Sequence, residues 1–520
     1  MNIPNPRIFI LGLALLMIGA NFWGFDIYIL DEAKNAGCAR EMWQRGDLIV
    51  PTFNDELRTD KPPFHYYFMM LAYSIFGVSP FSARLFSVIF GLLTVWVSMD
   101  FVKRYLGGKA AFWTGLTLAC SIQVAVQFHL ATPDPYLIFL LTLAQTQWFI
   151  AVLEGQKWRL YLSYVIFGLG VLAKGPVAIV VPGVALLLYL GLTGRLSWKG
   201  FLSVHPFRGI LTAILVAAPW YIAVGLETDG AWLKGFFLDH NINRFNSEKE
   251  GHGGIFLITP AIFWIALLPF SMFLVQAFRK AWQVRREHEL LAFAMSVVTA
   301  FVVFFSISQT KLPSYPAPAF PFGAMILGYW ISQIHSTKSL RVSLWIWLLL
   351  SLVIVAGVAV GIRFDKALSD LSYLAVFFVS LPISAALGLF WILRKQQLHQ
   401  GLMILAAGTF LAGQGFFYGA FPRVDRENPV QVVFSEVSPE TDFIGYRKVN
   451  PAFVFNLQRS VPTFESLDSL RAQLRRNPDF YIISVKKYED ELKQIEGLEE
   501  VIRQRDLFER PTTTVWRLKR

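Results

Sequence analysis

The sequence contains little charge and almost no cysteine, and both shortages limit what the chain can be. Charged residues make up 16% of its 520 residues, whereas hydrophobic residues make up 55% and aromatic residues 15%. This composition excludes an ordinary soluble enzyme. Cys38 and Cys120 are the only cysteines, and neither has a partner at metal-ligand spacing. The chain therefore carries no disulfide framework and no C-x-x-C motif.

Apolar runs of bilayer-spanning length recur along the chain, and each span needs about 20 residues. We predict an α-helical polytopic membrane protein with thirteen spans, at roughly 7–25, 81–101, 110–128, 133–152, 160–173, 176–193, 209–226, 254–278, 290–308, 313–333, 342–362, 371–393 and 400–421. The first run is expected to be a retained signal anchor, because its apolar stretch is longer than a signal-peptide core and is followed by a poor cleavage site.

Lysine and arginine in the short loops predict the orientation of the chain. They occur in loops on alternate sides of successive spans, so all of them share one face, which is cytoplasmic: Lys103, Arg104, Lys109, Lys157, Arg159, Arg195, Lys199, Arg208, Arg279, Lys280, Arg285, Arg286, Lys338, Arg341, Arg394 and Lys395. The net charge of +11 is then a topology signal, and no nucleic-acid binding is predicted. With the N-terminus inside, the thirteen spans place the loop at 31–63 and the C-terminal tail outside.

The composition changes after about residue 425, which predicts two domains. The first is a membrane domain over residues 1–424, with a first outer loop at 26–80 that contains interfacial helices. The second is a small α/β domain over residues 425–520. Its predicted strands are 430–434, 453–457, 481–485 and 513–518, and its predicted helices are 464–476 and 488–504. It has no phosphate-binding glycine loop or metal motif, so we expect it to cover or support a site made by the membrane domain.

Acidic, basic and imidazole side chains gather in five predicted outer loops. These residues are Asp31, Glu32, Lys34, Asp60 and Lys61 in the first loop, Asp134 in the second, Lys174 in the third, His240, Arg244 and His252 in the fourth, and Lys311 and Tyr315 in the fifth. A buried unpaired charge is costly in a membrane. Their convergence on one side therefore predicts a site at the outer interface.

Each of these residues also has a structural explanation when it is considered alone. Asp31 and Glu32 would favour the N-terminus of a helix over 31–45. The three outer lysines, Lys61, Lys174 and Lys311, would reach lipid phosphates as anchors. Asp134 would be a turn residue between two prolines, His240 and Arg244 would pair with Asp239 or another carboxylate, and His65, His129 and His252 would be structural.

Several motifs together resemble a known family. They are the Asp-Glu pair after the first span with AREMWQRGDLIVPTFN, then DKPP (60–63), ATPDP (131–135), LAKGP (172–176), APWY (218–221), FFLDHNINRF (236–245) and KLPSYPAPAFP (311–321). As an ordered set they resemble the bacterial aminoarabinose transferases of lipid A modification. They also resemble the wider protein O-mannosyltransferase-like group of GT-C glycosyltransferases, which implies a GT-C fold.

This resemblance implies an activity. Such enzymes take a sugar from an undecaprenyl- or dolichyl-phosphate carrier on the outer side and pass it to an acceptor with inversion. The family's first essential acid falls on Asp31 and its second acidic position on Asp134. The family arginine three residues after the first acid is Lys34 here, and Glu-Lys-Pro-Pro begins with Asp60. Lys is a point charge rather than a bidentate fork.

The resemblance also implies roles for these residues. Preorganised cations stabilise the charge of a leaving phosphate, so Lys61, Arg244 and Lys34 are the candidates, with His240 and Tyr315 as further phosphate contacts. Asp31 is a general base if the acceptor is a hydroxyl. It orients the sugar if the acceptor is a phosphate. Asp134 positions the acceptor or Lys34. Glu32, Asp60, Lys174, Lys311 and His252 are further site candidates.

The sugar and the acceptor stay open at this point. The sugar is aminoarabinose or another pentose or hexose, and the acceptor is lipid A, a glycolipid or a protein hydroxyl. The expected partners are this donor, this acceptor and membrane lipids. No cofactor is predicted to be required, and Asp60 is the candidate if a divalent metal takes part. A lipid transporter or flippase and an envelope scaffold are the alternatives from other classes.

Overall fold

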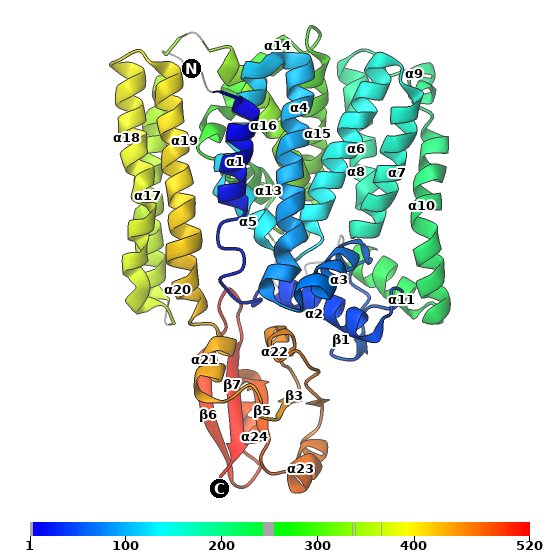
Figure 1. The fold of residues 1–520 in the computed structure, drawn as a ribbon, viewed down its shortest axis with the longest axis vertical. Coiled ribbons are helices and arrows are strands. Elements are labelled where there is room, and N and C mark those ends of the chain that lie inside the picture. Colours follow the sequence, from blue (N-terminus) through cyan, green and yellow to red (C-terminus); the bar gives the residue numbers. More distant parts are fainter. Residues whose placement is uncertain (1–3, 243–253, 335, 338–339, 366, 520) are drawn as a thin grey trace.

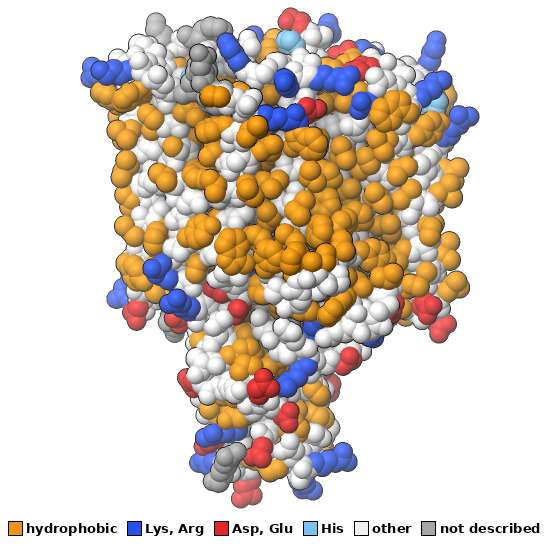
Figure 2. Space-filling model, viewed as in Figure 1, with side chains coloured by type: hydrophobic (Ala, Val, Ile, Leu, Met, Phe, Trp, Pro, Cys, Tyr) orange, Lys and Arg blue, Asp and Glu red, His pale blue; other side chains and the backbone are white. Residues whose placement is uncertain are grey.

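The computed structural model describes residues 4–242, 254–334, 336–337, 340–365 and 367–519. They form a helical bundle with a small domain at one end (Figure 1). Apolar side chains form a broad belt around the bundle, and lysine and arginine side chains gather at the end farthest from the small domain (Figure 2). The chain is a multi-pass helical membrane protein, and the predicted fold class is confirmed.

Among the described residues, seven helical segments are long and apolar enough to cross a membrane, or eight if one bent pair counts as a span. The seven are α4 (Pro80–Cys120), α6 (Asp134–Glu154), α9 with α10 (Trp198–Ser203 and Pro206–Glu227), α15 (Glu289–Ile307), α17 (Arg341–Phe364), η5 with α18 (Ser369–Phe378 and Ser380–Leu393), and α19 through α20 (Leu398–Asp425). The bent pair is α13 (Ile258–Ala266) and the segment Phe270–Gln283, which ends in α14 (Leu274–Gln283), at 114°.

This number is smaller than the predicted thirteen, for two physical reasons. First, α4 contains two predicted spans, because its backbone leaves the helical conformation at Gly107, where φ is 85°. A Cβ atom on Gly115 would collide with Met99, so the two halves of α4 fold back on each other. Second, α1 (Pro6–Ile18), α8 (Val177–Leu192) and α16 (Phe320–Ser332) are shorter than 18 residues, and α7 (Lys157–Lys174) carries three lysine and arginine residues.

The segment 26–80, predicted as the first outer loop, contains two helices, α2 (Leu30–Arg45) and α3 (Phe64–Phe76). Between them lies a short antiparallel hairpin of β1 (Thr52–Phe53) and β2 (Glu56–Leu57). The other short helices at the small-domain end of the bundle are α11 (Ala231–Lys234) and the π-helix η1 (Gly235–Ile242), whereas α5 (Ile122–His129) and α7 (Lys157–Lys174) lie within the bundle (Figure 1). The outer loops are therefore built mostly from short helices.

The small domain contains a five-stranded sheet in the order β4-β3-β5-β7-β6. The strands are β3 (Phe443–Tyr446), β4 (Thr463–Phe464), β5 (Tyr481–Val485), β6 (Leu498–Arg505) and β7 (Thr512–Leu518). Strand β3 runs parallel to β4 and β5, whereas β7 runs antiparallel to β5 and β6. The predicted strands at 481–485 and 513–518 and the predicted helix at 464–476, which is α23 (Leu467–Arg476), are confirmed.

Three predictions in this domain are wrong. The runs 430–434 and 453–457 lie in α21 (Pro429–Glu436) and α22 (Pro451–Asn456). Each follows an Asn-Pro pair in which the asparagine side chain caps the helix, and these start signals outweigh β propensity. The predicted helix at 488–504 contains only α24 (Glu489–Leu492), after which the chain forms β6 as the antiparallel partner of β7.

The small domain packs directly on α2. Arg40 of α2 donates from NH1 to the backbone oxygen of Val454 at 2.5 Å. Asn54 exchanges two hydrogen bonds with the backbone of Val461, at 2.7 and 3.0 Å. One apolar core includes residues of α2 and α3 together with Phe453 and other residues of the small domain. Contacts between residues about 400 positions apart in the chain therefore hold the small domain against α2 and the hairpin that follows it.

Candidate active site at the outer ends of the helices

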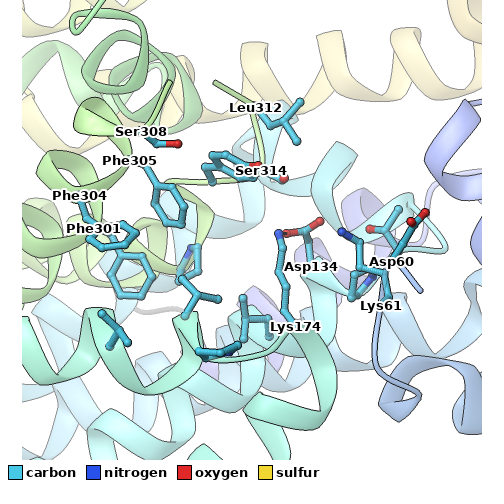
Figure 3. Close-up of a pocket in the computed structure, with 18 of the residues that line it drawn as sticks. Asp60, Lys61, Asp134, Lys174, Phe301, Phe304, Phe305, Ser308, Leu312 and Ser314 are labelled. Carbon is cyan, nitrogen blue, oxygen red and sulfur yellow. Dashed lines mark hydrogen bonds and ion pairs between the residues drawn. The ribbon is translucent and has the colours of Figure 1, made fainter. Parts of the chain in front are cut away.

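A cavity of about 540 Å³ opens at the end of the bundle that carries the small domain. Six of the predicted site residues line it: Asp31, Asp60, Lys61, Asp134, Lys174 and Tyr315. In Figure 3 the aspartates and lysines lie at one side of the cavity, and the side chains of Phe301, Phe304 and Phe305 lie at the other. The cavity therefore has a charged part and an apolar part.

Helix α2 places Asp31 in the cavity and its neighbour Glu32 behind it. Asp31 and Glu32 both lie in the first turn of α2, where carboxylates favour the helix N-terminus. Asp31 is exposed, whereas Glu32 is buried. The two adjacent carboxylates therefore have different surroundings, and only Asp31 lines the cavity.

Glu32 forms a buried ion pair with Arg84, which the sequence analysis missed. Arg84 donates from Nε and NH2 to the two carboxylate oxygens at 2.7 and 2.8 Å. Its remaining donors bind the backbone oxygens of Phe22, Phe25 and Asp26. Glu32 also accepts the N–H of Ala131 at 2.8 Å, so this pair ties α2 to the loop before Asp134. A single arginine near the start of an apolar span was the signal for it.

Replacing Arg84 by methionine is expected to lower the stability of the protein strongly. The change leaves the Glu32 carboxylate buried without its cation, and breaking such a pair costs about 3–5 kcal/mol. The control is Arg7→Met, because Arg7 pairs with Asp100 at 3.4 Å with both side chains exposed, and such pairs contribute at most about 1 kcal/mol. Thermal unfolding in detergent measures both, and equal melting temperatures would contradict this assignment.

Asp134 and Lys174 form an ion pair across the cavity wall. Asp134 is the first residue of α6, and Lys174 is the last residue of α7, just before Gly175 with φ 91°. Lys174 Nζ donates to Asp134 Oδ1 and lies 5.4 Å from the centre of the Tyr315 ring. Figure 3 shows the two charged ends meeting. Asp134 therefore pairs with Lys174, whereas Lys34 was one of its two predicted partners.

Three elements contribute most of the apolar part of the cavity. Helix α15 contributes Phe301, Phe304 and Phe305, helix α8 contributes Val177 and Val180, and η1 contributes Phe236 and Phe237. The phenylalanines of α15 follow an i, i+3, i+4 spacing, which places them on one face. The sequence analysis missed them, because an apolar side chain in a span looks the same whether it faces lipid or a cavity.

Of the remaining predicted site residues, the three that the structure describes with their side chains, Glu32, Lys34 and Lys311, do not line this cavity. Glu32 faces Arg84, Lys34 lies on α2 outside the lining, and buried Lys311 donates to the backbone oxygens of Ser306, at 2.9 Å, and of Ser308. Lys311 thus binds the last carbonyls of α15, which is a structural role. Arg244, His252 and the side chain of His240 lie outside the described residues.

Two buried histidines are held by structural contacts. His129 has its ring nitrogens 2.7 Å from the backbone oxygens of Ala125 and Ala20, and it stacks on Phe417 at 3.9 Å. His65 contacts Asn35. Within the described part of the chain, no group of three or more His, Cys, Asp or Glu side chains is placed to hold a metal ion. Cys38 and Cys120 are both buried and free.

A polytopic bundle with short outer helices, a small sheet domain and a charged cavity at one end defines a GT-C type membrane fold. The crystal structure of ArnT from Cupriavidus metallidurans bound to undecaprenyl phosphate has the same fold, with a TM-score of 0.82 and 20% identity, over 98% of this chain and 97% of that chain. The oligosaccharyltransferase of Archaeoglobus fulgidus is a more distant structural neighbour, with a TM-score of 0.53 and 11% identity, over 93% of this chain and 69% of that chain.

Sequence comparisons give the same group of proteins. The family described as dolichyl-phosphate-mannose-protein mannosyltransferase matches residues 60–222. The undecaprenyl phosphate-alpha-4-amino-4-deoxy-L-arabinose arabinosyl transferase of Pseudomonas aeruginosa is 28% identical over 59% of this chain. That of Aeromonas hydrophila is 30% identical over 57% of this chain. The matches span 56% and 54% of these two relatives. The chain resembles ArnT-like GT-C glycosyltransferases in both sequence and fold.

Proposed function

We propose that the chain is an integral-membrane glycosyltransferase that moves a sugar from a polyprenyl-phosphate carrier to an acceptor. The observation that carries this proposal is the cavity itself. In this cavity, charged side chains from separate segments lie next to the apolar part that is lined by phenylalanines. The charged residues are Asp31, Asp60, Asp134, Lys61 and Lys174. A polyprenyl-phosphate sugar needs both parts, because its chain is apolar and its phosphate and sugar are polar. The relatives named for undecaprenyl phosphate support this choice of donor.

Lys61 is the proposed contact for the phosphate of the donor. When the glycosidic bond breaks, negative charge grows on the phosphate oxygens. A cation already fixed in a cavity with an apolar wall stabilises that charge more than water does. Tyr315 and Lys174 lie at the same polar end and are the proposed secondary contacts. The apolar part of the cavity, at α8 and α15, then binds the first isoprene units of the donor.

Asp31 is the proposed contact for the transferred sugar and the acceptor. As an exposed carboxylate in the cavity wall, it accepts the proton of a hydroxyl acceptor as a general base. With a phosphate acceptor there is no proton to remove, and Asp31 instead orients the sugar and stabilises its oxocarbenium-like charge. The acceptor therefore decides which of the two roles Asp31 has.

The proposed location is a bacterial inner membrane with the cavity and the small domain on the periplasmic side. The gathering of lysine and arginine at the opposite end of the bundle supports this orientation. Lipid A or another envelope glycolipid is the proposed acceptor, in line with the aminoarabinose transferases among the relatives. The matching mannosyltransferase family supports a protein hydroxyl as the second candidate.

Lys174→Met is expected to reduce transfer about 10- to 100-fold. The change leaves Asp134 without its cation, and the carboxylate then repels the donor phosphate. In a double-mutant cycle, Asp134→Asn combined with Lys174→Met is expected to lose less activity than the two single changes predict. Coupling energies of about 0.5–3 kcal/mol are usual for residues in contact. Additive losses, measured as initial rates with radiolabelled donor, would mean that the pair does not act as a unit.

Mass spectrometry of a deletion strain tests the proposed function. Lipid A, other glycolipids and envelope proteins are compared between the parent, the deletion strain and a strain complemented with the intact gene. The class of molecule that loses a sugar-sized mass, and regains it on complementation, identifies the acceptor. Unchanged masses in all three fractions would argue against glycosyl transfer and favour the transporter alternative. Purified protein with undecaprenyl-phosphate sugar then tests transfer directly.

A further inference from the structure

Arg58 is a buried arginine next to the two cavity residues Asp60 and Lys61. Only 6% of its surface is exposed, and it follows strand β2 directly. Its N–H donates to the backbone oxygen of Pro51 at 2.9 Å, and its own backbone oxygen accepts from Trp232 Nε1 at 2.8 Å. The hairpin on one side and α11 on the other therefore fix the backbone from which this side chain extends.

The Arg58 guanidinium connects the two ends of the first outer loop. Its NH2 lies 3.2 Å from Asn35 Oδ1 and 3.3 Å from Asp60 Oδ2. Asn35 is four residues after Asp31, so the two share one face of α2, one turn apart. One nitrogen thus joins the helix face that carries Asp31 to the segment that carries Asp60 and Lys61.

The charge of Arg58 suits this position. Asp31 and Asp60 both line the cavity and repel each other. Burial lowers the pKa of Arg58, but the neighbouring groups Tyr66, Asp60, Cys38 and Asp31, in that order of effect, raise that pKa by more. A fixed positive charge therefore holds the two carboxylate segments together. A lysine cannot replace it fully, because its ammonium is a strongly hydrated point charge on a side chain one bond shorter, so it does not reach the oxygens of both Asn35 and Asp60 from the same backbone position.

The residues around Asn35 hold its amide in place and add no further positive charge beside Arg58. Asn35 Oδ1 also lies 3.3 Å from Tyr66 OH and from His65 Nε2, which holds the amide in place. Burial, with the nearby charges of Arg58 and Lys61, keeps the pKa of His65 well below its ordinary value. His65 is therefore neutral at pH 7 and adds no second positive charge to the cluster.

Arg58 differs from the structural arginine Arg84 in how its donors are used. Each nitrogen of the Arg84 guanidinium has a partner. Arg58 Nε and NH1 are buried without any partner in the described residues, so NH2 alone makes the recorded contacts. Unsatisfied buried donors are costly, and in native proteins they are few and call for an explanation.

We propose that Arg58 is a positioning residue that holds Asp31 and Lys61 at the separation that glycosyl transfer requires. The inference rests on the proposed function, in which Asp31 faces the sugar and Lys61 faces the phosphate. In the transition state, Asp31 must contact the sugar while Lys61 contacts the phosphate. Binding of the carrier phosphate alone needs only Lys61 and the apolar part of the cavity. Loss of Arg58 therefore affects the reaction rate more than carrier binding.

The test compares Arg58→Lys with Arg40→Lys, a matched change in the same loop. Arg40 is equally buried and also has an unpartnered Nε, but it binds Val454 and Glu41 on the side of α2 that faces the small domain. Three quantities are measured: kcat for sugar transfer, Kd for undecaprenyl phosphate, and the alkylation rate of Cys38. The last is measured in a Cys120→Ala background and needs no activity.

The alkylation rate of Cys38 measures whether α2 stays packed against the segment that carries Arg58. It lies on α2 three residues after Asn35, and burial raises the pKa of its thiol to about 12, so it reacts slowly in the folded protein. We expect Arg58→Lys to lower kcat about 100-fold, the usual cost of about 1 Å of misplacement. We expect Kd to stay within about 2-fold and alkylation to rise about 10-fold, because a displaced loop exposes the thiol and brings its pKa closer to the ordinary value. Arg40→Lys is expected to leave kcat close to that of the wild type.

Each other outcome has a definite meaning. If both variants have the same kcat and the same alkylation rate, Arg58 is structural and the inference is wrong. If Arg58→Lys weakens phosphate binding as much as it lowers kcat, Arg58 acts on the donor itself, and the inference is again wrong. If the wild type transfers no sugar from any donor while Arg58→Lys still speeds alkylation, the proposed function fails but the connection between the two loop ends stands.

Discussion

Replacing Asp31 by asparagine is expected to reduce sugar transfer by at least about 1000-fold without unfolding the protein. General-base contributions reach about 10²–10⁴-fold, and the asparagine also removes the negative charge that faces the sugar. Asparagine has nearly the same shape, and Asp31 is exposed in the cavity wall, so little packing is lost. Transfer is measured in membranes with labelled donor, and folding is checked by the melting temperature of the purified variant.

The matched control for Asp31 is Asp55→Asn in the same loop. Asp55 is exposed, does not line the cavity, and has a φ of 64°, a conformation that asparagine adopts readily. This control is expected to keep full activity. An Asp31→Asn variant with more than about a tenth of the wild-type rate would remove Asp31 from the mechanism, because neither proposed role tolerates the loss of the charge.

Replacing Lys61 by alanine is expected to reduce transfer by about 100- to 1000-fold. This is the usual effect of removing one preorganised group that stabilises developing negative charge. Because the donor phosphate carries charge before the reaction as well as during it, the KM for the donor is also expected to rise. Lys61→Arg, which keeps the charge but changes its geometry, is expected to recover part of the rate.

Lys234→Ala is the control for Lys61. Lys234 is an exposed lysine of α11 outside the cavity lining, near the same end of the bundle. Steady-state rates over a range of donor concentrations separate kcat from KM for each variant. If Lys61→Ala keeps both values and only Lys174→Met changes them, the donor phosphate binds Lys174, and the roles of the two lysines must be exchanged.

Much of the charged part of the site could be predicted from the sequence, because lysine and aspartate in short outer loops are rare without a reason. Asp31, Asp60, Lys61, Asp134, Lys174 and Tyr315 all line one cavity. The pairing of these groups could not be predicted. Glu32 and Asp31 are adjacent in the chain, yet the partner that buries Glu32 is Arg84, 52 residues away in α4.

Predictions failed where local pattern and long-range contact disagree. Residues 498–505 carry charges at a helical spacing, but pairing with β7 gives them an extended backbone. The fold-back at Gly107 joins two predicted spans within one helical segment, α4. Arg58 gave no signal as a buried group, because the residues that bury it come from α2, α3 and α11. Periodicity within one segment contains no information on such partners.

The contact between α2 and the small domain also sets the order in which the protein can mature. Arg40 and Val454 are separated by 414 residues. At synthesis rates of about 5–20 residues per second, the first loop waits roughly 20–80 s before its partner exists. Until then, the apolar face of α2 that packs on the small domain is uncovered, and the helix that carries Asp31 lacks the contacts made by the small domain. A half-made chain therefore spends most of its synthesis in the membrane before α2 has its full set of contacts.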